Sequence, residues 1–437
     1  MDTKKLRQKI LDLAIRGKLV PQDPNDEPAS VLLERIRAEK EQLIKEGKIK
    51  RSKKSVASDT SHYENVPFEV PEGWCWTTIG ELFQLQAGKF IEAPQISTCK
   101  DATHIYPCYG GNGLRGYVES YNRDGLFPII GRQGALCGNI NIAEGKFYAT
   151  EHAVVVETFA NIDIQLFVYF LIQLNLNQYA TATAQPGLAV KTINEVPIPL
   201  PPINEQHRIS MAIEKSLDTL SEIDQSKHAI RKSILQLKSR ILDLAISGKL
   251  AAQDCSDEPA LELLRRINPS FAPCDNRHYE NLPETWVEVE LGGICQLFDG
   301  EKIRDREYVN LDVKYLRGSK NGSKLTSGKY VPKDTLMILV DGENSGEVFI
   351  TPHEGYQGST FKLLGISSEL NRDYILLLIQ HSREHLKDNK VGSAIPHLNK
   401  KLFKQIHAPI PPYNEQGRIV NAVQMIMSKL EEILAAL

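Results

Sequence analysis

The stretch LRQKILDLAIRGKLVPQDPNDEPASVLLERI, residues Leu6–Ile36, returns without a gap as LKSRILDLAISGKLAAQDCSDEPALELLRRI, residues Leu237–Ile267. About 20 of the 31 positions are identical, at an offset of 231. A second pair recurs at an offset of 210, with PLPPINEQHRI beginning at Pro199 and PIPPYNEQGRI at Pro409. Internal repeats constrain architecture before any single residue does. The sequence therefore predicts a two-fold object built from one chain.

A long helix is predicted between the repeats, from Asn204 to about Ser247. Asparagine after a diproline favours a helix start, and Gly248 favours its end. Apolar residues alternate at spacings of four and three at positions 230, 234, 237, 241 and 244. This spacing is typical of a coiled-coil seam. A helix of about 44 residues spans roughly 65 Å and needs a partner to cover such a seam.

The ends of the chain supply a candidate partner. At offset 210 the last residue, Leu437, corresponds to Lys227, and at offset 231 Met1 corresponds to Lys232. The tail followed by the head thus reproduces the central segment, missing only His228–Arg231. We expect the termini to meet and form a second, broken helix antiparallel to the central one. The alternative is a tandem duplication whose termini never meet.

Two mixed domains flank the central helix, and they share several anchors. Each opens with HYEN, at His62 and His278, and continues with Pro-Glu-x-Trp. Later the glycines of IIGRQGALCGNI (Ile129–Ile140) align with those of ILVDGENSGEV (Ile338–Val348). Between the anchors the sequences diverge, which indicates one scaffold displaying two surfaces.

The predicted class is therefore α+β, with two mixed α/β domains separated by a pair of long antiparallel, coiled-coil-like helices in a pseudo-two-fold, circular plan. The predicted segments are an N-terminal helical region with a basic linker (1–60), the first domain (62–198), a central helical spacer region (199–268), the second domain (278–408) and a C-terminal helix (409–437). The stretch Ala38–Lys54 has no counterpart after Ile267. It is either a flexible tether or a segment that wraps a partner or DNA.

Composition excludes several classes of protein. No run of eighteen apolar residues is present, so no membrane span is expected. The N-terminus carries charges within its apolar stretch and does not resemble a signal peptide. The seven cysteines contain no CxxC pair and are expected to be reduced thiols of a cytoplasmic protein. A net charge of −3 gives no general nucleic-acid signature, although residues 301–333 carry nine Lys/Arg against four Asp/Glu. A solvated face is the simplest interpretation of that run.

Motifs for catalysis are missing from the sequence. GGNGLRG (Gly110–Gly116) contains GxGxxG, but a strand and turn rather than a helix are expected to follow it. IPPY at Ile410 lacks the polar first residue of the amino-methyltransferase motif. We find no AdoMet-binding FxGxG, P-loop, HExxH or PD…ExK set, and His381 with His385 is too few ligands for a metal. No catalytic, cofactor-binding or metal-binding residue is predicted.

The loops of both domains carry side chains suited to DNA. Arginine pairs bidentately with guanine and asparagine with adenine, while basic side chains contact phosphates. A plain β-turn remains the alternative for the loop at Gly110–Gly116. The candidate DNA-binding residues are Lys89, Tyr109, Asn112, Arg115, Arg132 and Gln133 in the first domain, and Lys302, Arg304, Arg306, Arg317, Lys320, Asn321, Lys324 and Asn344 in the second.

Four features of the sequence recur together: the paired PxPPxNEQxRI boxes, the repeated ILDLAIxGKL…DEPA segments, the PExW openings and the YGGNGLRGY loop. In these features the chain resembles the specificity (S) subunit of type I restriction–modification enzymes. The resemblance covers essentially the whole chain. It implies two target recognition domains, each recognising half of a bipartite double-stranded DNA site, with helices that fix the spacer. It also implies a non-catalytic subunit that binds two modification (methyltransferase) subunits and, in the full complex, restriction (translocase/nuclease) subunits. AdoMet, ATP and Mg would belong to those partners.

Two other functions stay open at this point. One is a protein-assembly scaffold without direct base recognition. The other is a self-sufficient methyltransferase or nuclease, which the missing motifs disfavour.

Overall fold

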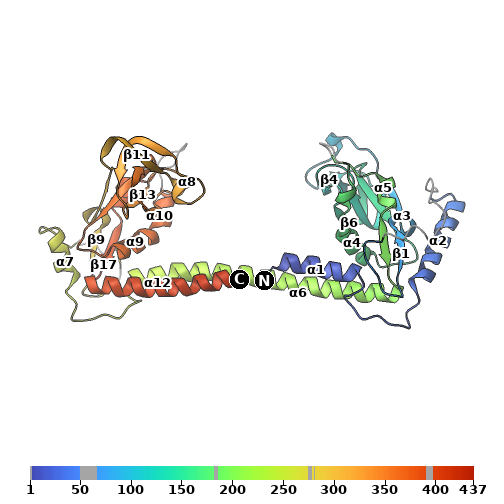
Figure 1. The fold of residues 1–437 in the computed structure, drawn as a ribbon, viewed down its shortest axis with the longest axis horizontal. Helices are drawn as coiled ribbons and strands as arrows, with labels where there is room; N and C mark the ends of the chain where they lie inside the picture. Colours follow the sequence, from blue (N-terminus) through green and yellow to red (C-terminus); the bar gives the residue numbers. More distant parts are fainter. Residues whose placement is uncertain (1, 50–65, 182–185, 274–277, 280, 390–396) are drawn as a thin grey trace. The chain divides into compact units, whose positions relative to one another are not determined.

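The computed structural model describes residues 2–49, 66–181, 186–273, 278–279, 281–389 and 397–437. It divides into two compact units, Met1–Ser226 and Lys227–Leu437, which are described one at a time (Figure 1). The first HYEN motif, at His62, and the end of the basic linker fall outside the described residues.

The long central helix is confirmed as α6, Ile203–Ile246, with 44 residues. It begins one residue earlier than expected, directly after Pro201–Pro202. It ends where Gly248 adopts a left-handed conformation, φ +70°. There the Lys249 N–H donates to the Leu244 carbonyl at 2.9 Å, which closes the last turn.

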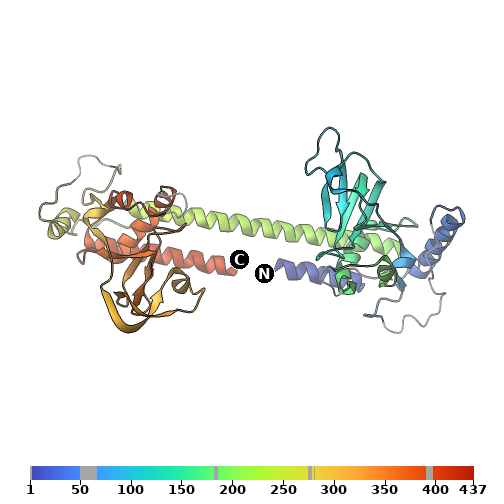
Figure 2. The ribbon, with the colours of Figure 1, turned by 90° about the horizontal axis from the view of Figure 1, so that it is seen from above.

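In the first unit, helix α1 (Thr3–Ile15) lies antiparallel to the first part of α6 (Figures 1 and 2). The Thr3 hydroxyl donates to Asp224 Oδ1 at 2.8 Å. At the other end of α1, Ile15 is buried in the same apolar cluster as Ile209 and Ile213. The head of the chain thus pairs with the first part of α6, as expected, and covers apolar positions 209 and 213 there.

In the second unit, helix α12 (Tyr413–Ala436) lies antiparallel to the remainder of α6. Lys238 and Glu431 form an ion pair, and the Lys227 ammonium donates to the carbonyl of Leu437. Apolar residues of both helices share one core, including Ile241 and Val423. Each end of the chain therefore pairs with its own part of α6; that the two ends meet stays a prediction.

The first domain is built on a six-stranded sheet with strand order β2-β7-β5-β6-β3-β4. Period-two alternation puts Val154 and Val156 of β7 into the main core under helix α4, and Val155 into a second core on the other face. The sheet is therefore covered on both sides. The elements after α1 are α2 (Ala29–Lys45), β1 (Cys75–Thr78), α3 (Ile79–Leu82), β2 (Gln84–Ala87), η2 (Ala93–Gln95), β3 (Tyr106–Gly110), β4 (Gly113–Val118), β5 (Arg123–Gly131), β6 (Ile140–Ala149), β7 (Ala153–Glu157), α4 (Ile164–Gln173), η3 (Leu176–Tyr179), α5 (Val190–Asn194) and β8 (Pro197–Leu200).

The second domain combines a four-stranded sheet, order β10-β16-β13-β14, with a closed β11-β12-β15 arrangement. Strand β13 again alternates, with Ile338 facing the main core that contains α9 and Met337 facing a smaller core. Its elements are α7 (Ala260–Ile267), β9 (Val287–Glu290), η4 (Leu291–Gly293), β10 (Cys295–Phe298), β11 (Lys302–Leu311), α8 (Val313–Leu316), β12 (Lys324–Val331), β13 (Leu336–Leu339), β14 (Val348–Ile350), β15 (Gly355–Gln357), β16 (Phe361–Ile366), α9 (Arg372–His381), α10 (Arg383–Asp388), α11 (Lys400–Lys404) and β17 (His407–Ile410).

A buried hydrogen-bond cluster explains why three separate motifs of the first unit are repeated. Glu205 of the NEQ box is 1% exposed. It accepts hydrogen bonds from Trp74 Nε1 at 2.9 Å and from Gln22 Nε2 at 2.7 Å. Burial raises the pKa of the Glu205 carboxyl, although these two donors act in the opposite direction. The cluster therefore joins the loop after α1, the domain entrance and the start of α6.

The second unit repeats this cluster with the corresponding residues. Glu415, also 1% exposed, accepts from Trp286 Nε1 at 3.0 Å and from Gln253 Nε2 at 2.6 Å. Just outside it, Arg418 pairs with Asp257 at 2.6 Å, as Arg208 does with Asp26 in the first unit. The PxPPxNEQxR boxes, expected only to start helices, also join each helix to its domain.

Glycine is required where the chain turns into this cluster. Gly17 has φ +65° and Gly248 has φ +70°, a conformation that L side chains rarely adopt. A Cβ atom would also lie 2.5 Å from Pro71 in the first unit and 2.6 Å from Pro283 in the second. The repeated GKL motif thus allows a helix end and a domain entrance to approach closely.

The N-terminal extension is structured over its described part. Helix α2 has 17 residues, whereas its counterpart α7 has 8. The ammonium group of Lys40 donates to the carbonyls of Gly80 at 2.7 Å and Phe83 at 2.9 Å, and burial lowers its pKa to about 8. Arg37 also pairs with Glu81. The flexible-tether alternative is therefore wrong for residues 38–45, which pack against the first domain.

Candidate nucleic-acid interface

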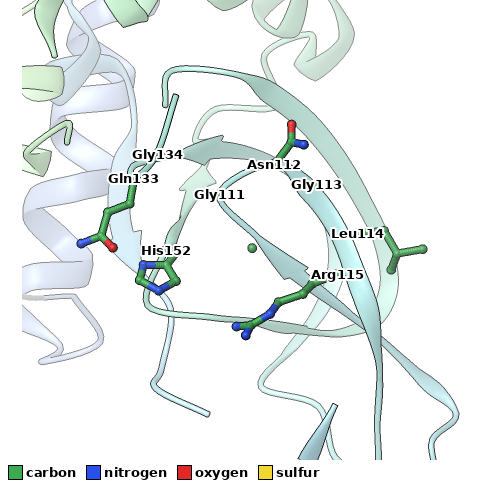
Figure 3. Close-up of a pocket in the computed structure, with 9 residues that line it drawn as sticks. Gly111, Asn112, Gly113, Leu114, Arg115, Gln133, Gly134 and His152 are labelled. Atoms are coloured by element: carbon green, nitrogen blue, oxygen red, sulfur yellow. The ribbon is translucent and has the colours of Figure 1, made fainter. Parts of the chain in front are cut away.

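The first domain has a surface hollow of about 430 Å³ at the tips of its strands (Figure 3). Strands β3 and β4 form a hairpin whose two-residue turn is Gly111–Asn112, followed by Gly113 with φ +89°. The GxGxxG stretch is thus a tight hairpin with no helix after it, as expected. The hollow is lined by Gly110, Gly111, Asn112, Gly113, Leu114, Arg115, Gln133, Gly134 and His152.

Three of the predicted residues line this hollow. Asn112 and Arg115 project from the hairpin, and Gln133 comes from the turn after β5; all three are exposed. The two segments approach so closely that a Cβ on Gly111 would lie 2.9 Å from the Gln133 carbonyl. Amide and guanidinium groups on a shallow, solvent-facing hollow can hydrogen-bond to base edges or phosphates. The segment is therefore a tight turn at the surface, and its contact with DNA stays a prediction.

The other predicted residues of the first domain have different surroundings. Lys89 is exposed next to β2. Tyr109 is half-buried, with its ring 5.6 Å from that of Phe147, and burial raises the pKa of its hydroxyl. Arg132 is half-buried, and its backbone N–H donates to the His152 carbonyl at 3.0 Å. Tyr109 is thus a neighbour of the hollow that also packs against the second core.

His152, which was not among the predicted residues, follows β6 by three residues and faces the hollow from a third segment (Figure 3). Around it lie buried polar atoms without a hydrogen-bond partner among the described residues: Arg132 Nε, Asn141 Nδ2, Thr150 Oγ1, Glu151 Oε2 and His152 Nδ1. A buried polar group left unpaired costs about 1–3 kcal/mol. A concentration of such groups at one surface favours a polar ligand or ordered water there. No motif or spacing in the sequence would have identified His152.

The second domain presents a different surface, an exposed two-stranded ribbon of β11 and β12. Its antiparallel register pairs Lys302 with Lys329 and Arg304 with Ser327, and it shifts between Arg304 and Tyr308. Asp305, inside the shift, has φ +61°. Bulges of this kind turn side chains in a new direction. Lys302, Arg304 and Arg306 are all exposed along the ribbon.

Ion pairs divide the basic residues of this surface into two groups. Lys324 pairs with Glu307 at 2.7 Å, and Arg317 pairs with Glu347. A second group of basic residues forms no ion pair with any residue that the structure describes; it consists of Lys302, Arg304, Arg306 and Lys320. This second group carries the uncompensated positive charge of the ribbon and the loop after α8.

The remaining predicted residues lie near these charges. Asn321 is exposed beside Lys320. Asn344 is half-buried, and its carbonyl accepts the Glu347 N–H at 3.2 Å within a turn. That turn matches the one in the first domain, because Gly342 and Gly346 have φ +106° and +94° where Gly134 and Gly138 have +87° and +86°. The glycine alignment between the two domains is thus confirmed.

A family model described as "Type I restriction modification DNA specificity domain" matches the chain twice, at residues 71–234 and 283–436. The chain belongs to this family. Each match covers one mixed domain together with a helical segment, as the repeat predicts. The resemblance stated from the sequence motifs is therefore confirmed.

Relatives of this chain include specificity subunits of type I restriction enzymes. The EcoAI specificity subunit of Escherichia coli is 27% identical, with coverage of 99% of this chain and 89% of that subunit. The EcoprrI specificity subunit of Escherichia coli is 42% identical, but over only 38% of this chain and 41% of that subunit. High identity is thus confined to part of the chain, whereas the overall organisation extends along all of it.

Solved structures of the family share the fold. One chain, from a structural study of complex assembly and conformational transition of the type I R-M system, has a TM-score of 0.54 at 15% identity and covers 85% of this chain and 94% of its own. The HsdS subunit from Thermoanaerobacter tengcongensis has a TM-score of 0.52 at 17% identity and covers 85% and 93%. The α+β class with two mixed domains and a long helix between them is confirmed. None of the described helices is both long and apolar enough to cross a membrane.

Proposed function

We propose that this specificity-family chain is a non-catalytic DNA-recognition subunit that recognises a bipartite double-stranded target, one half-site with each domain. The observation that carries the proposal is one scaffold displayed twice with two different polar surfaces. The Trp–Glu–Gln clusters and the β1–β8 and β9–β17 pairs are repeated, whereas over the described residues the first domain presents the hollow and the second presents the basic ribbon. A protein that recognises two unrelated half-sites needs this combination.

In the first domain, recognition centres on the hollow. We expect Arg115 to pair with a guanine edge, and Asn112 and Gln133 with adenine edges, since these are the bidentate partners that the groups favour. We expect Lys89 and Arg132 to contact the DNA backbone nearby, and Tyr109 to contribute its hydroxyl group. The unpaired polar atoms around His152 support a polar ligand at this position.

In the second domain, recognition centres on the β11–β12 ribbon. A two-stranded β-ribbon fits the major groove of B-DNA. Arg304 and Arg306, free of ion pairs among the described residues, contact base edges or phosphates. Lys302, Lys320 and Lys324 contact phosphates, and Arg317, Asn321 and Asn344 complete the surface.

Helix α6 and the terminal helices serve the assembly. We propose that the length of α6 sets the spacer between half-sites, and that two modification subunits dock on the chain, joined by restriction subunits in the full complex. AdoMet, ATP and Mg are supplied with those partners. A net charge of −3 agrees with partners that provide part of the DNA contact.

The proposal is tested by exchanging residues 62–198 for the corresponding domain of another family member. Cells that express the hybrid with its modification partner are then analysed by methylome sequencing. We expect one half-site to change and the other to be retained, and the reciprocal exchange of residues 278–408 to alter only the second half-site. If both exchanges leave the methylated sequence unchanged, the domains are assembly modules and base recognition lies elsewhere.

A further inference from the structure

A cluster of three potential metal ligands lies at the entrance of the second domain. His407 Nδ1 lies 2.8 Å from Glu288 Oε1, and His278 Nδ1 lies 3.1 Å from the same oxygen. The two imidazole rings stack with centroids 3.5 Å apart. The three ligand atoms all lie within 4.8 Å of one another. Two strands and a loop supply them, since Glu288 is on β9, His407 on β17 and His278 before both.

Hydrogen bonding leaves part of this cluster unexplained. Glu288, whose side chain is 6% exposed, accepts the backbone N–H groups of His278 at 3.0 Å and Tyr279 at 3.3 Å. His407 Nδ1 is buried and has no hydrogen-bond partner, despite its short distance to the carboxylate. The short contact therefore lacks hydrogen-bond geometry. Ligand atoms of one metal ion behave in this way, because each points at the ion rather than at its neighbour.

The distances and the chemistry both suit a transition metal. Zinc binds imidazole nitrogen and carboxylate oxygen at about 2.0–2.2 Å, so two such ligands of one ion lie roughly 3 Å apart. Two imidazoles with one carboxylate form a ligand set for zinc or ferrous iron. Metal binding through imidazole nitrogen requires the neutral ring.

The first domain provides an internal comparison. At the positions that pair in the same β1–β8 register, Trp76 replaces Glu288 and Pro197 replaces His407. Neither residue can serve as a strong metal ligand. The cluster is thus absent from the described part of the repeated scaffold and is not needed to fold the β-pair.

We propose that His278, Glu288 and His407 bind one divalent transition-metal ion, which ties the entrance of the second domain to its β9–β17 pair. The three ligands have no motif spacing in the sequence, since they are 10 and 119 residues apart, and no metal site was predicted from it. The proposed site is independent of DNA recognition.

The test uses the full chain, stripped with a chelator and reloaded with one equivalent of Zn²⁺ or Co²⁺. Metal content after gel filtration is measured by elemental mass spectrometry. Coordination of Co²⁺ is followed by visible absorption spectroscopy. Variants are Glu288→Gln, His407→Asn and His278→Asn; the control is Glu290→Gln, an exposed carboxylate two residues along the same strand. Elemental analysis of protein purified without added metal identifies zinc or iron.

We expect one metal ion per chain and a Zn²⁺-dependent rise in melting temperature for the wild type and the control. The three ligand variants should lose stoichiometric metal and show no such rise. His278→Asn keeps the test valid if the buried variants fold poorly, because the His278 side chain is 54% exposed. A wild type that retains no zinc, cobalt or iron, or a folded His278→Asn variant that binds metal like the control, overturns the proposal.

Discussion

Replacing Arg304 and Arg306 by alanine isolates the contribution of the β11–β12 ribbon to DNA binding. Both side chains are exposed, and neither forms an ion pair with any described residue. Their charge is therefore available to DNA without first breaking an internal contact. We expect the double variant to bind the target more weakly and with a smaller dependence on salt.

The size of the effect follows from what each arginine contacts. A phosphate contact contributes about 0.9 to the slope of log affinity against log salt, so two such contacts lower the slope by about 2. A bidentate guanine contact is worth about 1–3 kcal/mol, or roughly 5- to 150-fold in affinity. Phosphate contacts reduce affinity for all sequences alike, whereas base contacts also relax one half-site.

Lys329 provides the matched control on the same ribbon. It lies opposite Lys302 in the register, but its ammonium is 2.9 Å from Asp299, which also pairs with Lys362. Because its ammonium is already held in an ion pair with Asp299, Lys329→Ala should change the salt slope less than the double variant does. Exposed ion pairs of this kind contribute about 0–1 kcal/mol, so stability should also change little.

The assay is fluorescence anisotropy of the chain with its modification partner on a duplex that carries the motif found by methylome sequencing, from 50 to 300 mM salt. A double variant with an unchanged slope and unchanged affinity would refute our assignment of the ribbon to DNA. If complex formation alone weakened, the second domain would be a protein-docking surface.

Three further outcomes test the scaffold. Deleting His228–Arg231 removes about one turn, or about 6 Å, of α6. The preferred spacer should then shorten by about one to two base pairs, with both half-sites unchanged. Altered half-sites would contradict the proposal that the length of α6 sets the spacer. A circular permutant that joins Leu437 to Met1 and opens the chain between residues 268 and 278 should remain active. The reason is that Thr3 contacts Asp224 and Leu437 contacts Lys227 in their respective units. A folded permutant that cannot assemble or bind DNA would exclude the circular plan. Glu415→Gln should destabilise the chain by about 1–3 kcal/mol near pH 4, because the amide can accept from only one of its two donors. Burial raises the folded-state pKa of Glu415, so the stability that this group contributes to the wild type is present below its unfolded-state pKa and is lost as pH rises through the folded-state pKa. The cost of the substitution, measured by urea unfolding, should therefore shrink toward pH 7. A cost that grows with pH would show that the pKa shift has the opposite sign.

The repeat, the long helix and the family were all predictable from the sequence. Apolar spacing, a diproline start and a glycine end are local signals, and α6 accordingly matched its expected bounds to within one residue. The repeated motifs marked Trp74 and Glu205 as a recurring pair. Their contact was not predictable, because 131 residues separate the two and no periodicity links them.

The binding surfaces depend on tertiary structure in the same way. Asn112 and Arg115 were placed together by their own hairpin, but Gln133 and His152 reach the hollow only because β5, β6 and β3 are adjacent in the sheet. Tyr109 appeared in sequence to be a loop residue and is held against Phe147 by the second core. Which cations are free was equally hidden, since Lys324 and Arg317 find their carboxylates through strand pairing and turn packing.

The sequence by itself thus determined the duplication, the helix and the absence of catalytic motifs, because these properties reside in spacing and in residue identity along the chain. Tertiary structure decided which side chains are buried, which charges stay unpaired and which distant ligands converge. His278, Glu288 and His407 show the reason most clearly: antiparallel pairing of β9 with β17 brings together residues that are 119 positions apart. Sheet register creates such proximity, and it is set by the packing of the whole domain.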